Sequence, residues 1–248
     1  MSYRSKVVKS GDYLENELYP VSKEETKKTR RRKLKETTKK MKNLNDKNRI
    51  KNATRLANTN FTTKDLFITT TYTNERLPKS FKEAIQRLEN YIKRIKRRLK
   101  KEGLPPLKYI ATTEMGKKGR IHHHLIISGD LDRDIIEELW IKREKGFCNT
   151  KRLQFGEFGL EGLVKYMLKK AVGYKKVTRS RNLKTPDVGI NDFEYSRRKI
   201  YDLAKSQGGL ELEEKFKGYK IVEFKSVVNE VLDAVYISVK MKRMEWEK

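Results

Sequence analysis

The feature that most constrains the fold is the run of residues 119–127, Gly-Arg-Ile-His-His-His-Leu-Ile-Ile, which holds all three histidines of the chain. Its apolar end is typical of a β-strand, in which successive side chains point to opposite faces. His122 and His124 therefore share one face of the predicted strand, and His123 points to the other face. Two imidazoles two residues apart on a strand can chelate a divalent metal ion through neutral ring nitrogens.

A carboxylate precedes this strand across a short turn. Residues 109–114 and 121–128 flank the turn sequence Met-Gly-Lys-Lys-Gly, and we expect them to pair as a β-hairpin. The pairing would bring Glu114 toward the two histidines and complete a metal site of two imidazoles and one carboxylate. The alternative is a surface strand whose histidines only form hydrogen bonds. A His-x-His pair with a carboxylate on the same hairpin favours the metal site.

The charge of the chain indicates what kind of partner it binds. It has 60 lysines and arginines against 33 acidic residues, a formal net charge of +27 and a pI near 10.0. Such a chain attracts polyanions, and nucleic acid is the commonest one. A generically basic surface, or binding to anionic lipid, is the alternative.

Membrane and secretory classes are not expected. The sequence has no window of about 18 apolar residues that could cross a membrane. It also has no apolar stretch after its basic N-terminus that could serve as a signal peptide. The lone Cys148 excludes an intramolecular disulfide framework and a zinc site of several cysteines. We therefore expect a soluble protein of the cytoplasm.

The first 60 residues are poor in large apolar side chains and rich in lysine and arginine. We expect them to form a basic N-terminal arm, flexible or partly helical until it meets DNA. Residues 53–57 hint at a helix late in this arm. The alternative is a solvated helical hairpin without function. The expected DNA contacts of the arm are Arg30, Arg31, Arg32 and Lys33.

Residues 61–190 read as strand, helix, hairpin, helix and strand. Residues 67–73 are β-branched and aromatic, and Ser80 with Glu83 forms a capping box before a helix that reaches about residue 101. This order predicts an α+β fold, with a central antiparallel sheet and flanking helices. Residues 191–248 are predicted as a C-terminal extension that packs on or completes this domain. Strands are expected there over 220–224 and 234–241.

The predicted helix over 161–171 carries a second reactive group. Tyr166, Lys169 and Lys170 lie three and four residues apart, so they are neighbours on one face of this helix. A phenol is a poor nucleophile at its free pKa near 10, and an adjacent ammonium favours the phenolate. A tyrosine beside lysines on a helix is usually structural. Downstream of a His-x-His strand in a strongly basic chain, we interpret it as a nucleophile.

Taken together and in this order, these motifs resemble the HUH endonucleases, and within them the rolling-circle replication initiators of phages and plasmids. The apolar, threonine-rich strand over 67–72 is similar to the family's first motif, which has a structural role. Residues 119–124 match its metal motif, and Tyr166 with the two lysines matches its nucleophile motif. Residues 180–186 are similar to a segment of phage-type members. The resemblance covers residues 65–190 and implies an RRM-like or ferredoxin-like core.

The resemblance implies a mechanism. Glu114, His122 and His124 would hold Mg²⁺ or Mn²⁺, and Tyr166 would form a 5′-phosphotyrosine link that leaves a free 3′-OH. Lys169 or Lys170 would stabilise the developing negative charge. Since Lys170 occupies the position of a second tyrosine, the chain resembles a single-tyrosine initiator. His123 is expected to pack or to form a hydrogen bond on the opposite face.

The expected partner is single-stranded or hairpin origin DNA, in a bacterial host or as the product of a phage or plasmid. No Walker A motif is present, so a separate helicase and host replication proteins are expected as further partners. A transposase or a relaxase would share the chemistry, although a tyrosine that follows the histidines argues against a relaxase. A non-catalytic DNA-binding regulator is the other alternative. The expected DNA contacts beyond the arm are Lys117, Lys118, Arg120, Arg179, Arg181 and Lys184.

Overall fold

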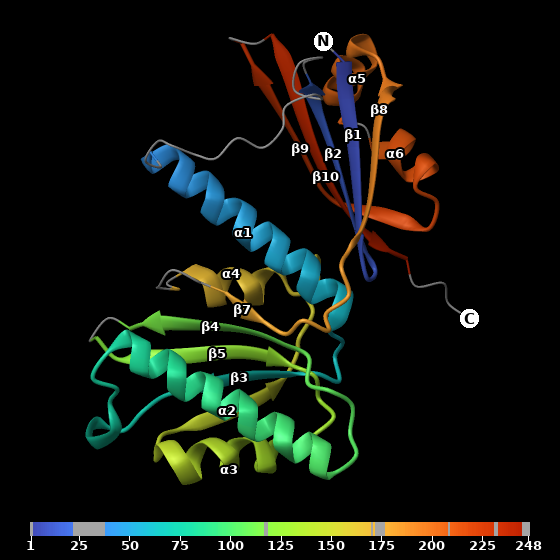
Figure 1. Cartoon of the computed structure of the whole chain (residues 1–248). Coiled ribbons are helices and arrows are strands. Elements are labelled where there is room, and N and C mark those ends of the chain that lie inside the picture. Colours follow the sequence, from blue (N-terminus) through green and yellow to red (C-terminus); the bar gives the residue numbers. More distant parts are fainter. Residues whose placement is uncertain are drawn as a thin grey trace. The chain divides into compact units, whose positions relative to one another are not determined.

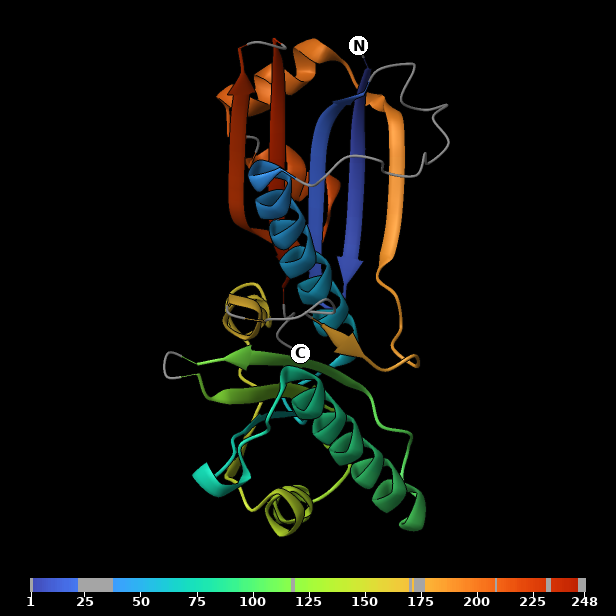
Figure 2. The ribbon, with the colours of Figure 1, turned by 60° about the vertical axis from the view of Figure 1, so that its left-hand side comes forward.

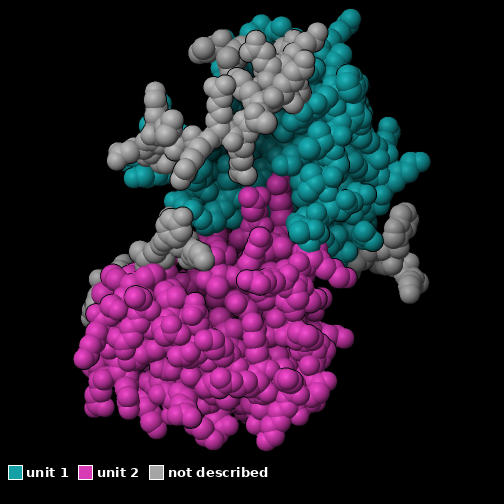
Figure 3. All heavy atoms as spheres, in the orientation of Figure 1, with its two compact units in different colours: residues 1–51, 157–159, 185–248 teal, residues 52–156, 160–184 magenta. Residues whose placement is uncertain are grey.

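The computed structural model describes residues 2–21, 38–116, 119–169, 171, 177–207, 209–230 and 233–244. The chain forms two compact units, coloured separately in Figure 3. The first comprises residues 1–51, 157–159 and 185–248, and the second comprises residues 52–156 and 160–184. Among the described residues, no helix has the length and apolar character needed to span a membrane.

The second unit contains a five-stranded antiparallel sheet with the order β6-β3-β5-β4-β7. Its strands are β3 (Leu66–Thr70), β4 (Tyr109–Met115), β5 (Ile121–Ile127), β6 (Cys148–Arg152) and β7 (Thr178–Arg179). Helix α2 (Phe81–Lys101) connects β3 to β4, and α3 (Arg133–Glu144) connects β5 to β6. The succession β3-α2-β4-β5-α3-β6 is the ferredoxin-like arrangement. The predicted α+β fold with a central antiparallel sheet is therefore confirmed.

Helix α2 begins where its sequence predicts. The Ser80 hydroxyl accepts a hydrogen bond from the backbone N–H of Glu83 at 3.1 Å. The Glu83 carboxylate accepts one from the backbone N–H of Lys79 at 2.7 Å, one residue earlier than an ideal capping box requires. A short 3₁₀ helix, η2 (Asn74–Arg76), separates β3 from this cap.

The two faces of this sheet are covered by different helices. Helices α2 and α3 pack on one face, where Tyr91, Ile95, Leu125 and Trp140 are buried in a common core. Helix α4 (Glu161–Lys169) lies on the other face (Figures 1 and 2). Because side chains alternate along β5, its residues contribute in turn to the core and to the face that carries α4.

The first unit has its own five-stranded sheet, with the order β8-β1-β2-β10-β9. Its strands are β1 (Ser2–Ser10), β2 (Tyr13–Val21), β8 (Asp187–Tyr195), β9 (Tyr219–Asn229) and β10 (Ala234–Arg243). Helices α5 (Arg197–Lys205) and α6 (Gly209–Lys215) pack against one face (Figure 1). The core between them includes Leu14, Leu18, Leu203, Ile237 and Val239.

The structure corrects the predicted organisation of both ends of the chain. A flexible or helical arm over residues 1–60 is wrong for residues 2–21, which form β1 and β2. The strands that pair with β1 and β2 lie more than 160 residues away in the sequence, so a local count of apolar residues could not reveal the sheet. The late helix is confirmed, since α1 spans Lys39–Asn60. Residues 191–248 contribute strands to the sheet of β1 and β2 and none, among those described, to the sheet of the second unit.

Candidate active site

The register of the hairpin places three predicted metal ligands on one face of the sheet. Glu114 of β4 lies directly opposite His122 of β5, and Thr112 lies opposite His124. On the other side of β5, Thr69 of β3 also lies opposite His124. Directly opposed residues of antiparallel strands point to the same face. This is the face that carries α4.

Glu114 and His124 approach each other on this face. Glu114 Oε1 lies 3.6 Å from His124 Nε2, and the two side chains are 13% and 2% exposed. His124 Nε2 is buried and has no hydrogen-bond partner among the described residues. The hydroxyl of Thr69 lies 3.3 Å from the other ring nitrogen, Nδ1. A hydrogen bond to Nδ1 leaves the lone pair of Nε2 facing the carboxylate, as in a metal-ligating histidine.

Burial controls the protonation of His124. It lowers the pKa of the imidazole, while the nearby Glu114 carboxylate acts in the opposite direction. The neutral ring, which is the form that coordinates metal ions, is therefore favoured at neutral pH.

His122 shares this face but has a different orientation. Its side chain is half-buried, and its ring nitrogen Nε2 lies beside Gly116, where an added methyl group would approach it to 2.9 Å. Within the described part of the chain, no three His, Cys, Asp or Glu side chains are arranged to hold a metal ion. The structure thus brings Glu114 and His124 together and leaves the ring of His122 at the turn.

His123 lies on the opposite face, inside the core. Its Nε2 is 2.8 Å from the Tyr72 hydroxyl, and its Nδ1 is 2.9 Å from the Thr113 hydroxyl. Burial lowers the pKa of His123 to about 3, so the ring is neutral. The predicted packing and hydrogen bonding on the opposite face are confirmed.

Tyr166 projects from α4 onto the face that carries Glu114 and His124. Its ring lies 5.2 Å from the ring of His124 and 6.4 Å from that of Phe67, measured between centroids. Phe67 in turn stacks on His124 at 5.8 Å, with an interplanar angle of 11°. Tyr166 keeps 54% of its surface exposed, so its hydroxyl is accessible to a substrate. The sequence predicts only a structural role for Phe67, although strand alternation puts it on the same face as Thr69.

The predicted lysines are described only in part. Lys169 is the exposed last residue of α4. Its neighbour Lys165 forms an ion pair with Glu161 at 3.0 Å, so it is a less available cation. Lys170, the second predicted lysine, lies outside the described residues.

The predicted DNA contacts lie in several places. Arg120 donates a hydrogen bond to Asn74. Arg179 and Arg181 line a cavity beside α2. Lys184 is exposed, and its backbone is held by two hydrogen bonds to the side chain of Asn60. The other predicted contacts lie outside the described residues: Arg30, Arg31, Arg32, Lys33, Lys117 and Lys118.

Comparison with known families gives a match that covers this site. A family model of replication-associated proteins, the ORF2 type, matches residues 65–172, which begin just before β3 and extend beyond α4. The matched residues include Glu114, the three histidines and Tyr166. Comparison with curated proteins and with solved structures gives no match. The family match supports a replication initiator of the Rep type.

Proposed function

We propose that the chain is a metal-dependent endonuclease that nicks and rejoins single-stranded DNA at a replication origin. The observation that carries the proposal is the convergence of Tyr166, His124 and Glu114 on one face of the sheet. A similarity to replication-associated proteins and a net charge of +27 agree with a DNA substrate.

Fit to a divalent ion is supported by the chemistry of the side chains. The buried, unpaired Nε2 of His124 beside a carboxylate is the environment of a metal ligand. Glu114, His122 and His124 would hold Mg²⁺ or Mn²⁺, and His122 would have to turn away from Gly116 to take part. When bound, the ion would supply positive charge that polarises a phosphoryl oxygen.

In the proposed reaction the hydroxyl oxygen of Tyr166 forms a bond to phosphorus, and the bond from phosphorus to the 3′-oxygen breaks. The phenolic proton passes to water, and the departing 3′-oxygen takes a proton from water to become a 3′-OH. The product is a 5′-phosphotyrosine. Lys169 supplies a positive charge within one helical turn of Tyr166. Attack by a later 3′-OH reverses these steps and joins strands without a nucleotide cofactor.

The test uses a pool of random single-stranded oligonucleotides, because the origin sequence is unknown. Protein and DNA are incubated with Mn²⁺ or with EDTA and denatured, and covalent adducts are isolated and sequenced. We expect adducts with Mn²⁺ only, enriched in one sequence. Binding without adducts in every metal tested would instead support the alternative, a non-catalytic DNA-binding regulator.

A transposase or relaxase would give the same adduct. The DNA sequences joined to the protein distinguish them, since a transposase recognises the ends of a mobile element rather than an origin. Strand transfer into a second oligonucleotide would not separate these classes, because all of them rejoin strands.

A further inference from the structure

A cavity of about 690 Å³ opens beside α2 in the second unit. Four apolar side chains contribute to its wall: Leu99, Leu104, Leu107 and Tyr109. Four cationic side chains line it as well: Lys96, Lys100, Arg179 and Arg181. No carboxylate is among its lining residues. The volume lies within the usual range of ligand pockets.

The segments that form this cavity are tied together. Tyr109 and Ser180 exchange two hydrogen bonds, from the Tyr109 N–H to the Ser180 hydroxyl at 3.1 Å and from the Ser180 N–H to the Tyr109 carbonyl at 3.0 Å. The Asn182 side-chain amide donates to the Pro106 carbonyl at 3.1 Å. Residues about 70 positions apart in the sequence are therefore held in fixed positions, and the cavity is preformed.

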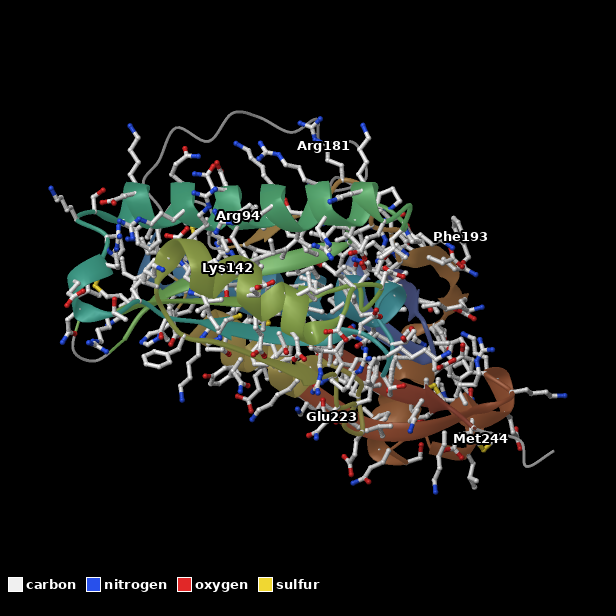
Figure 4. All side chains as sticks on the ribbon, turned by 90° about the horizontal axis from the view of Figure 1, so that it is seen from below. Arg94, Lys142, Arg181, Phe193, Glu223 and Met244 are labelled. Carbon is white, nitrogen blue, oxygen red and sulfur yellow. The ribbon has the colours of Figure 1, made fainter. Side chains whose placement is uncertain are left out.

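The cations are placed to receive a negative charge. The ammonium of Lys96 lies 5.3 Å from the ring centre of Tyr109, and Arg181 extends beside the C-terminal half of α2 (Figure 4). None of the four cations forms an ion pair with a described residue. Cations that share one cavity without a carboxylate repel one another, and a phosphate would remove that repulsion.

We propose that this cavity binds one unstacked nucleotide of a single-stranded DNA substrate, with the base against the apolar side chains and the adjacent phosphates on the cations. The inference rests on the proposed function and identifies a part of its substrate site. Arg179 lies opposite Ile110, four residues along β4 from Glu114, so about 13 Å separates this edge of the cavity from the catalytic face. A nucleotide held here would belong to the strand that is cleaved.

The first experiment measures binding of a fluorescent thymidine oligonucleotide of about 15 residues, long enough for a typical single-strand site. All proteins carry Tyr166→Phe, and EDTA is present, so no cleavage occurs. The double variant Lys96→Ala/Lys100→Ala should bind about tenfold more weakly, and its salt slope should fall by about 1.4, or ~0.7 per lost phosphate contact. The matched control is Lys93→Ala/Arg97→Ala, which removes two cations from another face of the same helix. Equal losses in the two variants would mean that α2 is a general polyanion surface and would overturn the pocket.

The second experiment tests the base. An abasic oligonucleotide of the same length keeps the phosphates, so unvaried pocket residues should favour the thymidine oligonucleotide by about tenfold, as expected for one stacked base. Leu104→Trp fills the cavity without changing charge and should abolish this preference. If Leu104→Trp does not fold, as judged by thermal unfolding, Leu104→Phe takes its place. A preference that persists in the filled variant contradicts the proposal.

The same variants distinguish single-stranded DNA from an acidic polypeptide. If Leu104→Trp weakens binding of poly-glutamate as much as binding of DNA, the cavity accepts acidic chains in general and the proposal fails. Because these measurements use a protein without the Tyr166 hydroxyl, they do not depend on catalysis. Loss of nicking with intact pocket binding would therefore refute the endonuclease and leave the pocket in place.

Discussion

The ring of Tyr166 in α4 lies edge-on against the ring of His124 in β5, with centroids 5.2 Å apart and an interplanar angle of 66°. His124 in turn lies 3.6 Å from the Glu114 carboxylate. A phenol, an imidazole and a carboxylate from three separate elements thus meet on one face of the sheet. The apolar side of α4, with Val164, Met167 and Leu168 buried, fixes the direction in which Tyr166 points.

Tyr166→Phe should abolish covalent attachment to DNA. The substitution removes only a hydroxyl from a side chain that is 54% exposed, so the free energy of unfolding should change by less than about 0.5 kcal/mol. Affinity for uncleaved DNA should also be retained. Mass spectrometry of protein trapped on cleaved DNA measures the adduct and identifies the modified residue.

Tyr236→Phe is the matched control, because Tyr236 is also an exposed tyrosine but lies on β10 in the first unit. It should leave the yield of adduct unchanged. A phosphotyrosine peptide that maps outside residues 161–169 would refute the assignment of the nucleophile.

The three histidines should separate into two classes. His124→Ala and His122→Ala should lower nicking by at least about tenfold and weaken Mn²⁺ binding, measured by calorimetry. His123→Ala should instead lower the free energy of unfolding by about 2–4 kcal/mol, because it leaves a cavity and removes the partners of the Tyr72 and Thr113 hydroxyls. Weaker Mn²⁺ binding in a folded His123→Ala protein would argue against the division by strand face.

Strand alternation was sufficient to predict this division from the sequence. His122, His123 and His124 are consecutive, so their faces follow from the period of a strand once the hairpin is recognised. Helix α2 was predicted as accurately, since Ser80 and Glu83 mark its start and the apolar positions repeat at helical spacing. These predictions rely on contacts between residues close together in the sequence.

The sheet of the first unit could not be predicted in the same way. Residues 2–21 pair with residues 187–195 and 237–242, and their strand character depends on those distant partners. The orientation of His122 was missed for a similar reason, since its ring lies beside Gly116 only because of the geometry of the turn. The cavity beside α2 also depends on distant segments, because Lys96 and Arg181 line it together.

Cys148 should be slow to alkylate in the native protein. Burial raises the pKa of its thiol to about 12, and the Tyr91 hydroxyl 3.8 Å away offsets this only in part. Since the thiolate is the reactive form, the native rate with iodoacetamide should keep rising about tenfold per pH unit between about pH 8 and 11. In guanidinium the unfolded thiol, with a pKa of about 8.5, should level off above about pH 9. A native rate that also levels off in that range would show that the thiol is not buried as described.

The basic segment that contains Arg30, Arg31, Arg32 and Lys33 should contribute to DNA binding through charge alone. Deleting residues 1–60 would remove β1 and β2 from their sheet, so a variant with glutamine at these four positions is the better test. If all four side chains contact phosphates, the slope of log affinity against log salt should fall by about 3, or ~0.7 per lost contact on single-stranded DNA. Fluorescence anisotropy with a thymidine oligonucleotide measures it. The matched control replaces the three arginines by lysine, which keeps the charge, and should keep the slope. An unchanged slope in the glutamine variant would exclude this segment from the DNA interface.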